Sequence, residues 1–227
     1  MRLQVFLSHN GVCSRRKAMA LVQSGQVTVD GTIVNEPSFE VDENKHAVHV
    51  NGKEVNAKAL VYLLLNKTKG VVTSRSGYGQ EATIYSLLPE EWRHLSPVGR
   101  LDKDTEGLLI LTNDGDLNFA LTHPKFLVDK TYFAIVRGGL KKPDIERMER
   151  GIMLDGKKTS PAKMKHIRTK DNQTEFEITI HEGRKRQIRL MFAKIHHPVV
   201  YLKRIQQGPI TLGALKSGAF RRLTSQE

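Results

Sequence analysis

The chain has 227 residues, of which 39% are hydrophobic and 26% are charged, and its formal net charge is +12. This length and composition allow a real hydrophobic core, in one domain or in a small domain followed by a larger one. No apolar run reaches the roughly 18 residues of a transmembrane helix, and the lone Cys13 excludes both an internal disulfide and a cysteine-based zinc site. We therefore expect a cytoplasmic protein that is not bound to a membrane.

The first 50 residues have the pattern of a small, separate unit. Residues 3–10 place apolar side chains at helical spacing, and Ser14 can cap a second helix that follows. The alternation of valines after residue 26 predicts short strands, and Asp30-Gly31 predicts a hairpin turn between two of them. A second turn at Asn51-Gly52 leads into a polar stretch, so we assign residues 1–50 to a first domain and 51–60 to a linker.

Residues 61–227 have the pattern of a second, larger domain that contains more strands than helices. No regular alternation of strand and helix is present, which favours a mixed, mainly antiparallel sheet in an α+β protein. We expect a loop over residues 70–79 and a turn at Asn113-Asp114-Gly115. The predicted strands cover residues 60–65, 108–111, 132–136, 176–180, 202–205 and 210–212. A short predicted helix includes Leu87 and Leu88 and ends near Pro89, and two further helices are predicted over residues 142–148 and 187–196.

The positive charge is concentrated in the last hundred residues. Residues 130–227 contain 22 lysines and arginines against nine aspartates and glutamates, whereas residues 61–129 contain seven against nine. A one-sided positive charge attracts phosphate backbones and releases counterions on binding. The distribution favours a nucleic-acid partner over a basic surface that has none.

The N-terminal unit resembles the S4 RNA-binding domain. The resemblance rests on residues 11–17 and 25–31, in which two helices are followed by a hairpin. Arg15, Arg16 and Lys17 begin the second helix, where free backbone N–H groups and basic side chains together form a phosphate site. The alternative is that these three side chains form only a solvated helix end.

The most informative segment is residues 99–115, Gly-Arg-Leu-Asp-Lys-Asp-Thr-Glu-Gly followed by an apolar strand and a turn. It is an acidic loop leading into a buried strand, a place where catalytic groups are often held by a rigid scaffold. The pattern alone does not choose among Asp102, Asp104 and Glu106. A surface turn, or a magnesium site on these three carboxylates, would also be compatible with it.

Together with residues 130–132, 182–189 and 202–223, this loop resembles the pseudouridine synthases that pair an S4 domain with a catalytic domain and modify ribosomal RNA. The resemblance covers essentially the whole chain. It implies that Asp102 is the catalytic aspartate, that Tyr132 contacts the target base and that Arg189 pairs with the aspartate. It also implies that Arg100 helps to displace the base. Further RNA contacts are expected from Arg184, Lys185, Arg186, Lys203 and Arg204.

Pseudouridine formation breaks the N1–C1′ bond of uridine, turns the uracil and rejoins it through C5. No redox step and no external donor is needed, so we expect neither a cofactor nor a metal. The carboxylate can act as a nucleophile, or it can remove a sugar proton so that the base is eliminated. The expected partner is ribosomal RNA or a ribosomal subunit precursor, bound by a monomer. The alternative is a non-catalytic S4-type RNA-binding or ribosome-assembly protein.

Overall fold

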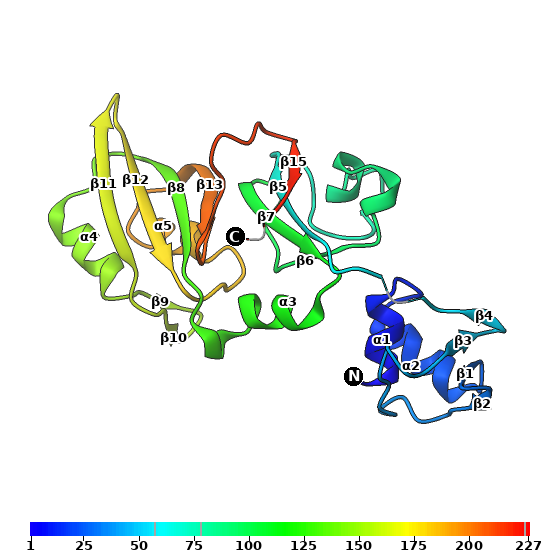
Figure 1. Cartoon of the computed structure of the whole chain (residues 1–227). Coiled ribbons are helices and arrows are strands. Elements are labelled where there is room, and N and C mark those ends of the chain that lie inside the picture. Colours follow the sequence, from blue (N-terminus) through cyan, green and yellow to red (C-terminus); the bar gives the residue numbers. More distant parts are fainter. Residues whose placement is uncertain (57, 78, 225) are drawn as a thin grey trace.

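The computed structural model describes residues 1–56, 58–77, 79–224 and 226–227. Figure 1 shows a small N-terminal unit of helices and short strands beside a larger unit built on a long, twisted sheet. One described segment, residues 58–61, leads from the first unit to the second. No helix within the described residues has both the length and the apolar character needed to cross a membrane.

The N-terminal unit packs two helices against a small antiparallel sheet. Its core contains Leu3, Phe6 and Leu7 from the first helix and Val22 from the second, each at most 2% exposed. The Oγ of Ser14 accepts a hydrogen bond from the N–H of Lys17, which confirms the predicted helix cap. The elements are α1 (Leu3–His9), α2 (Arg15–Gln23), β1 (Val27–Val29), β2 (Thr32–Ile33), β3 (Val48–Val50) and β4 (Lys53–Glu54).

The boundary of this unit differs from the prediction at its C-terminal end. β4 pairs antiparallel with β3 across the Asn51-Gly52 turn, so residues 53–54 belong to the first sheet and their assignment to the linker was wrong. A two-residue turn with positive φ matches the right-handed twist of the flanking strands, which explains why the chain returns here. Ala57, which belongs to the predicted linker, lies outside the described residues.

Among the described residues, nine strands form the large sheet, and seven of them follow one another in the order β11-β12-β8-β13-β7-β5-β15. All of these neighbours pair antiparallel except β13 and β7, which confirms the mixed, mainly antiparallel sheet. β6 and β14 pair with β7 and β13 outside this order. The strands are β5 (Tyr62–Lys67), β6 (Ser96–Pro97), β7 (Glu106–Thr112), β8 (Lys130–Arg137), β11 (Lys163–Lys170), β12 (Gln173–Ile180), β13 (Val199–Gln207), β14 (Ile210–Thr211) and β15 (Phe220–Arg222).

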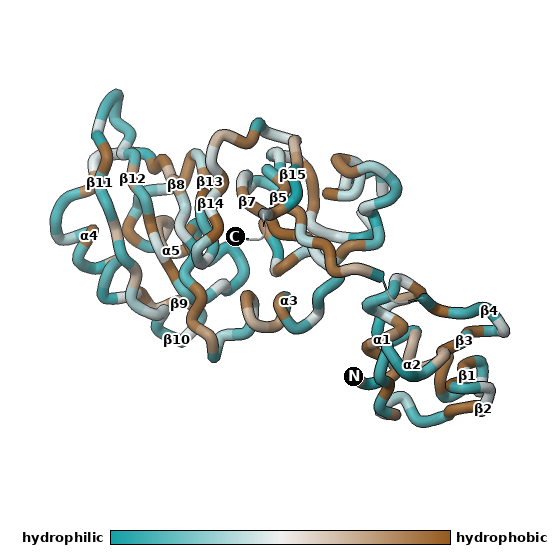
Figure 2. Tube along the Cα trace, viewed as in Figure 1, coloured by the Kyte–Doolittle hydropathy of each residue, from teal (hydrophilic) through white to brown (hydrophobic). Residues whose placement is uncertain are grey.

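The remaining elements cover this sheet or connect its strands. α4 and α5 contribute Met148 and Phe192, both fully buried, to the core that they share with Phe176 of β12. Figure 2 shows brown, apolar segments along β5, β7 and β12, and teal segments along the exposed β11. The elements are α3 (Gly115–Thr122), α4 (Lys142–Glu149), α5 (Gln187–Ala193), the 3₁₀ helices η1 (Ile84–Leu87), η2 (Glu90–Trp92) and η3 (Pro124–Phe126), and the small hairpin β9 (Met153–Leu154) with β10 (Lys157–Lys158).

The predicted turn at residues 113–115 was wrong, because a helix begins there. The Oδ1 of Asp114 accepts hydrogen bonds from the N–H groups of Asp116 and Leu117, so Asp114 caps α3. Aspartate is a strong N-cap, and the same Asn-Asp-Gly sequence suits a turn and a helix start equally well. The loop predicted over residues 70–79 is present, apart from Tyr78, which lies outside the described residues.

Gly107 allows β7 and β13 to approach closely just after the acidic loop. Its φ is +102°, and a Cβ added there would lie 2.2 Å from the carbonyl oxygen of Arg204. Only glycine tolerates both the positive φ and this contact. The start of β7, where the acidic loop ends, is therefore paired directly with β13, at Glu106 and Gly107.

Candidate active site

A cavity of about 390 Å³ lies where the acidic loop, β8 and the start of α5 meet. Asp102 enters it from the loop before β7, Tyr132 from β8 and Arg189 from α5. The cavity is also lined by four of the predicted RNA-binding residues, Arg100, Arg184, Lys185 and Arg186. Segments separated by more than 80 positions in the sequence are thus brought to one site by the sheet.

Lys67, the last residue of β5, donates hydrogen bonds to the backbone of the acidic loop. Its side chain is fully buried, and its Nζ donates to the carbonyl oxygens of Thr68, Asp102 and Thr105 at 3.1, 3.1 and 2.8 Å. Burial lowers the pKa of Lys67 to about 8, although the carboxylates of Asp104, Glu106 and Asp102 act in the opposite direction. Lys67 therefore connects the end of β5 to the backbone of the acidic loop at Asp102 and at Thr105.

The three carboxylates of the loop differ in their partners. The Asp104 carboxylate receives two hydrogen bonds from Arg186, and Glu106 accepts one from the Tyr201 hydroxyl at 3.2 Å. The carboxylate of Asp102, which is half-buried, takes part in no hydrogen bond or ion pair among the described residues. Asp102 is thus the loop carboxylate left available to a bound molecule.

Arg189 pairs with a different aspartate from the one expected. Its Nε lies 3.3 Å from Oδ2 of Asp104, and its Nη2 donates to the Asp104 carbonyl oxygen at 2.7 Å. The expectation that Arg189 pairs with Asp102 was therefore wrong for this structure. The reason is the turn at residues 103–104, which brings Asp104 nearer the first turn of α5. Arg189 nevertheless lines the same cavity as Asp102, and the Asp102 charge favours its protonated form.

Asp104 connects the acidic loop to the start of α5 through its ion pairs with Arg186 and Arg189. Burial raises the pKa of its carboxyl, but the hydrogen bond from Arg186 and the charges of Arg189 and Arg186 outweigh burial and hold this pKa below its usual value. A carboxylate bound by two guanidinium groups is poorly placed to bind a cation. Among the described residues, no group of three histidine, cysteine, aspartate or glutamate side chains could hold a metal ion.

Comparisons with known proteins agree with this geometry. The family model described as RNA pseudouridylate synthase matches residues 61–194, and the S4 domain model matches residues 1–46. The chain belongs to the RNA pseudouridylate synthase family. It is 42% identical to the ribosomal large subunit pseudouridine synthase B of Bacillus subtilis, over all of this chain and 93% of that protein.

Further relatives support the same assignment. The chain is 36% identical to the ribosomal small subunit pseudouridine synthase A of Vibrio cholerae, over all of this chain and 97% of that protein. A crystal structure of a pseudouridylate synthase superposes with a TM-score of 0.70 at 30% identity, covering all of this chain and 97% of that one. The predicted fold, an S4 domain followed by a pseudouridine synthase domain, is confirmed.

Some of the predicted RNA-binding side chains are open to solvent, and others hydrogen-bond to the backbone of the protein itself. Arg100 and Lys185 are exposed at the cavity, and Lys203 is half-buried on β13. Arg184 donates to the carbonyl oxygens of residues 157 and 158, so it holds the β9–β10 hairpin against the start of α5. Arg204 is only 2% exposed and its Nε donates to the Leu108 carbonyl oxygen at 2.7 Å. Arg204 is therefore not an exposed side chain, and its contact with RNA stays a prediction.

The basic residues of the S4 domain, Arg15, Arg16 and Lys17, are exposed in the first turn of α2. We expect the triple change to alanine to weaken binding of ribosomal RNA and to reduce the slope of log K against log salt concentration by about 2 to 3, since each lost phosphate contact removes roughly 0.9. Filter binding between low and moderate salt measures this slope. Lys45→Ala, on the same unit and ion-paired to Asp42, is the matched control. An unchanged slope would exclude a phosphate site at α2.

The sequence did not identify Lys67 as a residue that holds the acidic loop, and it did not identify the partners of Asp104. Lys67 could have been suspected, because a lysine that ends a strongly apolar strand must find acceptors for a buried ammonium group. The sequence contains no such signal for the partners of Asp104, because they lie more than 80 positions away.

Proposed function

We propose that this chain isomerises a specific uridine of ribosomal RNA to pseudouridine, with Asp102 as the reacting carboxylate. The observation that carries the proposal is the position of Asp102 in a cavity shared with Tyr132 and Arg189, with its carboxylate unbound. The ribosomal target is supported by two relatives, whose names are ribosomal large subunit pseudouridine synthase B and ribosomal small subunit pseudouridine synthase A. Ribosomal RNA, or a subunit precursor, is the partner in this proposal.

In the proposed reaction the Asp102 carboxylate attacks the ribose or removes a sugar proton, and either step releases uracil from C1′. The detached ring turns against the Tyr132 side chain, and its C5 bonds to C1′. If Asp102 attacked the ribose, this step displaces its carboxylate from C1′; if Asp102 removed a sugar proton, it returns that proton to the sugar. The C5 proton is then lost to solvent, and N1 gains a proton. A base inside a helix must first leave its stack, and the exposed Arg100 at the cavity is placed to occupy the space it leaves. The ion pairs of Arg186 and Arg189 with Asp104 keep the acidic loop in position during these steps.

Residues 1–50, extended by β4, serve as the RNA-binding domain in this proposal, and residues 61–227 form the catalytic domain. The chain acts in the cytoplasm as a monomer. A non-catalytic S4-type binding or assembly protein would have no use for the unbound carboxylate in the cavity. The two functions give different results with RNA labelled at C5.

The test uses ribosomal RNA from a strain that lacks this gene, labelled with tritium at C5 of uridine. We expect the wild-type chain to release tritium and to create one new site that carbodiimide treatment and primer extension detect. Naked large and small subunit RNA, assembled subunits and assembly intermediates are tried in parallel. Tight, salt-dependent binding without tritium release from any of them would favour the binding-protein alternative.

A further inference from the structure

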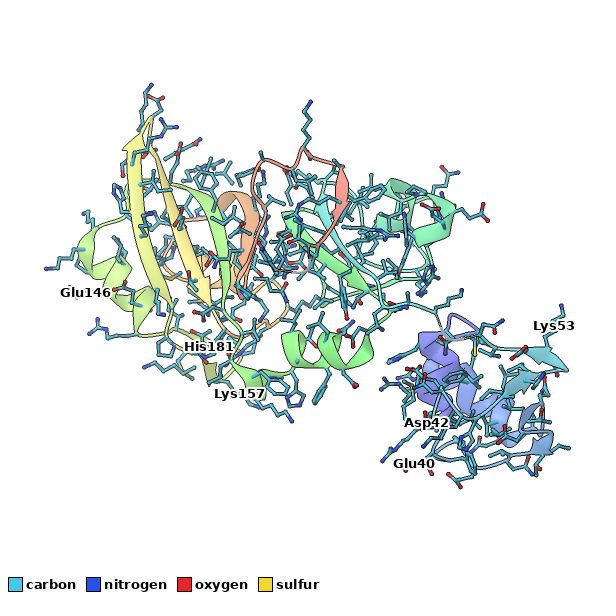
Figure 3. The ribbon with its side chains drawn as sticks, viewed as in Figure 1. Glu40, Asp42, Lys53, Glu146, Lys157 and His181 are labelled. Carbon is cyan, nitrogen blue, oxygen red and sulfur yellow. The ribbon has the colours of Figure 1, made fainter. Side chains whose placement is uncertain are left out.

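A second, smaller cavity of about 170 Å³ adjoins the first. Arg100, Tyr132 and Gly183 line both cavities, so they separate the two spaces. The second cavity lies among the ends of β8, β12 and β13 and the segment that follows α3. Figure 3 labels His181, one of its lining residues, at the end of β12.

The wall of this cavity carries two cations that have no carboxylate ion-pair partner among the described residues. Arg204 is 2% exposed, and its Nη2 is buried without a hydrogen-bond partner among the described residues. Within the part of the chain that the structure describes, the half-buried Lys130 donates only to the carbonyl oxygens of Val128 and His181, at 3.0 and 3.4 Å. A buried donor left unpaired costs free energy, and native proteins rarely keep one without a ligand, a water or a function.

The nearby carboxylates are bound elsewhere. Glu182 lines the cavity, but its oxygens accept from the N–H of Ser160 and the Gln187 amide and pair with Arg184. Asp129 is ion-paired to Lys163 at 3.8 Å. Burial lowers the pKa of Lys130, the Arg204 charge lowers it further, and Asp129 only partly opposes them. The cavity thus contains uncompensated positive charge.

We propose that the second cavity binds a phosphate group of the RNA substrate, next to the target nucleotide, on Lys130 and Arg204. This inference rests on the proposed function for the identity of the strand. A nucleotide in the first cavity would place an adjoining phosphate beyond Arg100 and Tyr132, which is where the two cations lie. A phosphate oxygen supplies the acceptor that Arg204 lacks.

Gln207 supports RNA over DNA as the strand that supplies the phosphate. Its side chain is fully buried in the wall of the cavity, and its Oε1 is without a hydrogen-bond partner among the described residues. An acceptor of this kind needs a donor, which a phosphodiester cannot supply. The ribose 2′-hydroxyl beside the phosphate can donate, and it distinguishes RNA from DNA. One ribose-phosphate unit would give a hydrogen-bond partner to both the Nη2 of Arg204 and the Oε1 of Gln207.

The first test asks whether the cavity takes phosphate, and it requires no RNA substrate. Thermal unfolding of the full chain is followed in inorganic phosphate and in chloride at equal ionic strength. We expect phosphate to raise the wild-type midpoint by about 3 °C, as binding to the folded state alone would do. Lys130→Met should lose this increment. Lys165→Met, an exposed lysine of β11, should keep it.

The increment is compared within each variant, because replacing a poorly compensated cation can itself change stability. Lys130→Gln replaces Lys130→Met if the latter does not fold. The absence of an increment in wild type, or equal increments in wild type and the Lys130 variant, would overturn the proposal. In that case the cavity holds only water.

The second test identifies the source of the phosphate. RNA hairpins carrying the mapped uridine are made with a neutral methylphosphonate at one position at a time around it. One position should raise the wild-type KM about tenfold, and the same replacement should have no effect on Lys130→Met. A phosphate increment without such a position would restrict the site to free phosphate and overturn its assignment to RNA. If no RNA is modified at all, the proposed function fails, while the thermal test still reports on the cavity.

Discussion

Asp102→Asn is expected to reduce tritium release from C5-labelled ribosomal RNA by at least about a thousandfold. Asparagine has nearly the same shape, but it has no negative charge with which to attack the sugar or accept its proton. The side chain makes no hydrogen bond or ion pair among the described residues, so the change should leave the fold intact. RNA affinity should be unchanged or slightly higher, because one charge that repels phosphate is removed. Single-turnover assays at saturating enzyme measure the chemical step apart from binding.

The control for this change is Asp116→Asn, an exposed carboxylate in the first turn of α3 that lies outside both cavities. It should keep wild-type activity. Asp104→Asn tests the neighbouring carboxylate, which binds Arg186 and Arg189. If Asp104→Asn lost all chemistry while Asp102→Asn retained more than a tenth of the wild-type rate, the roles assigned to the two aspartates would have to be exchanged.

Lys67→Met is expected to lower kcat about a hundredfold while KM for RNA changes little, as is typical when a reacting group is displaced by about 1 Å. The Nζ of Lys67 holds the carbonyl oxygens of Thr68, Asp102 and Thr105, and methionine fills the volume without donating to any of them. Lys69→Met, an exposed lysine two residues further on, is the matched control. Equal activity of the two variants would show that the Lys67 contacts do not position Asp102.

The pH profile separates positioning from a general loss of stability. Three carbonyl oxygens require three N–H donors, which the ammonium form supplies and the neutral amine does not. The pKa of Lys67 is about 8 in the folded chain, so its ammonium group is present below pH 8 and lost above it. Wild-type kcat should therefore fall on the alkaline side with an apparent pKa near 8, and Lys67→Met should lack this decline. An identical alkaline decline in both proteins would assign it to another group.

The contribution of Lys67 to stability has the opposite sign. Its pKa is lower in the folded than in the unfolded chain, where the ordinary value is 10.5, so the unfolded chain binds more protons between pH 8 and 10.5. The free energy cost of burying the charged amine is therefore largest below pH 8 and is relieved as pH rises through this window. Activity and stability should thus diverge above pH 8, which a purely structural role would not produce.

The sequence by itself determined the secondary structure wherever one local signal dominates. The apolar run of residues 60–65 was predicted as a strand and lies largely in β5, and the helix of residues 142–148 and the alternation in 176–180 were found nearly as predicted. The Gly-Arg-Leu-Asp loop pointed to Asp102 through a family resemblance, since its own chemistry does not choose among three nearby carboxylates. β11 was missed because half of its side chains are charged and nearly all are exposed, so it shows no clear apolar alternation. Its pairing with β12 is what makes it a strand.

Only the tertiary structure decided how the charges pair. Arg189 is bound to Asp104, Arg204 is buried in the wall of a second cavity, and Lys67 lies beneath the acidic loop. Each of these contacts joins segments that lie between 35 and 96 positions apart, apart from the local bond of Lys67 to Thr68. The strength of an ion pair depends on distance and burial, which sequence spacing does not contain. The chain thus specifies its fold through local patterns, and the packing of the acidic loop against α5 and β13 determines which of its carboxylates remains unbound among the described residues.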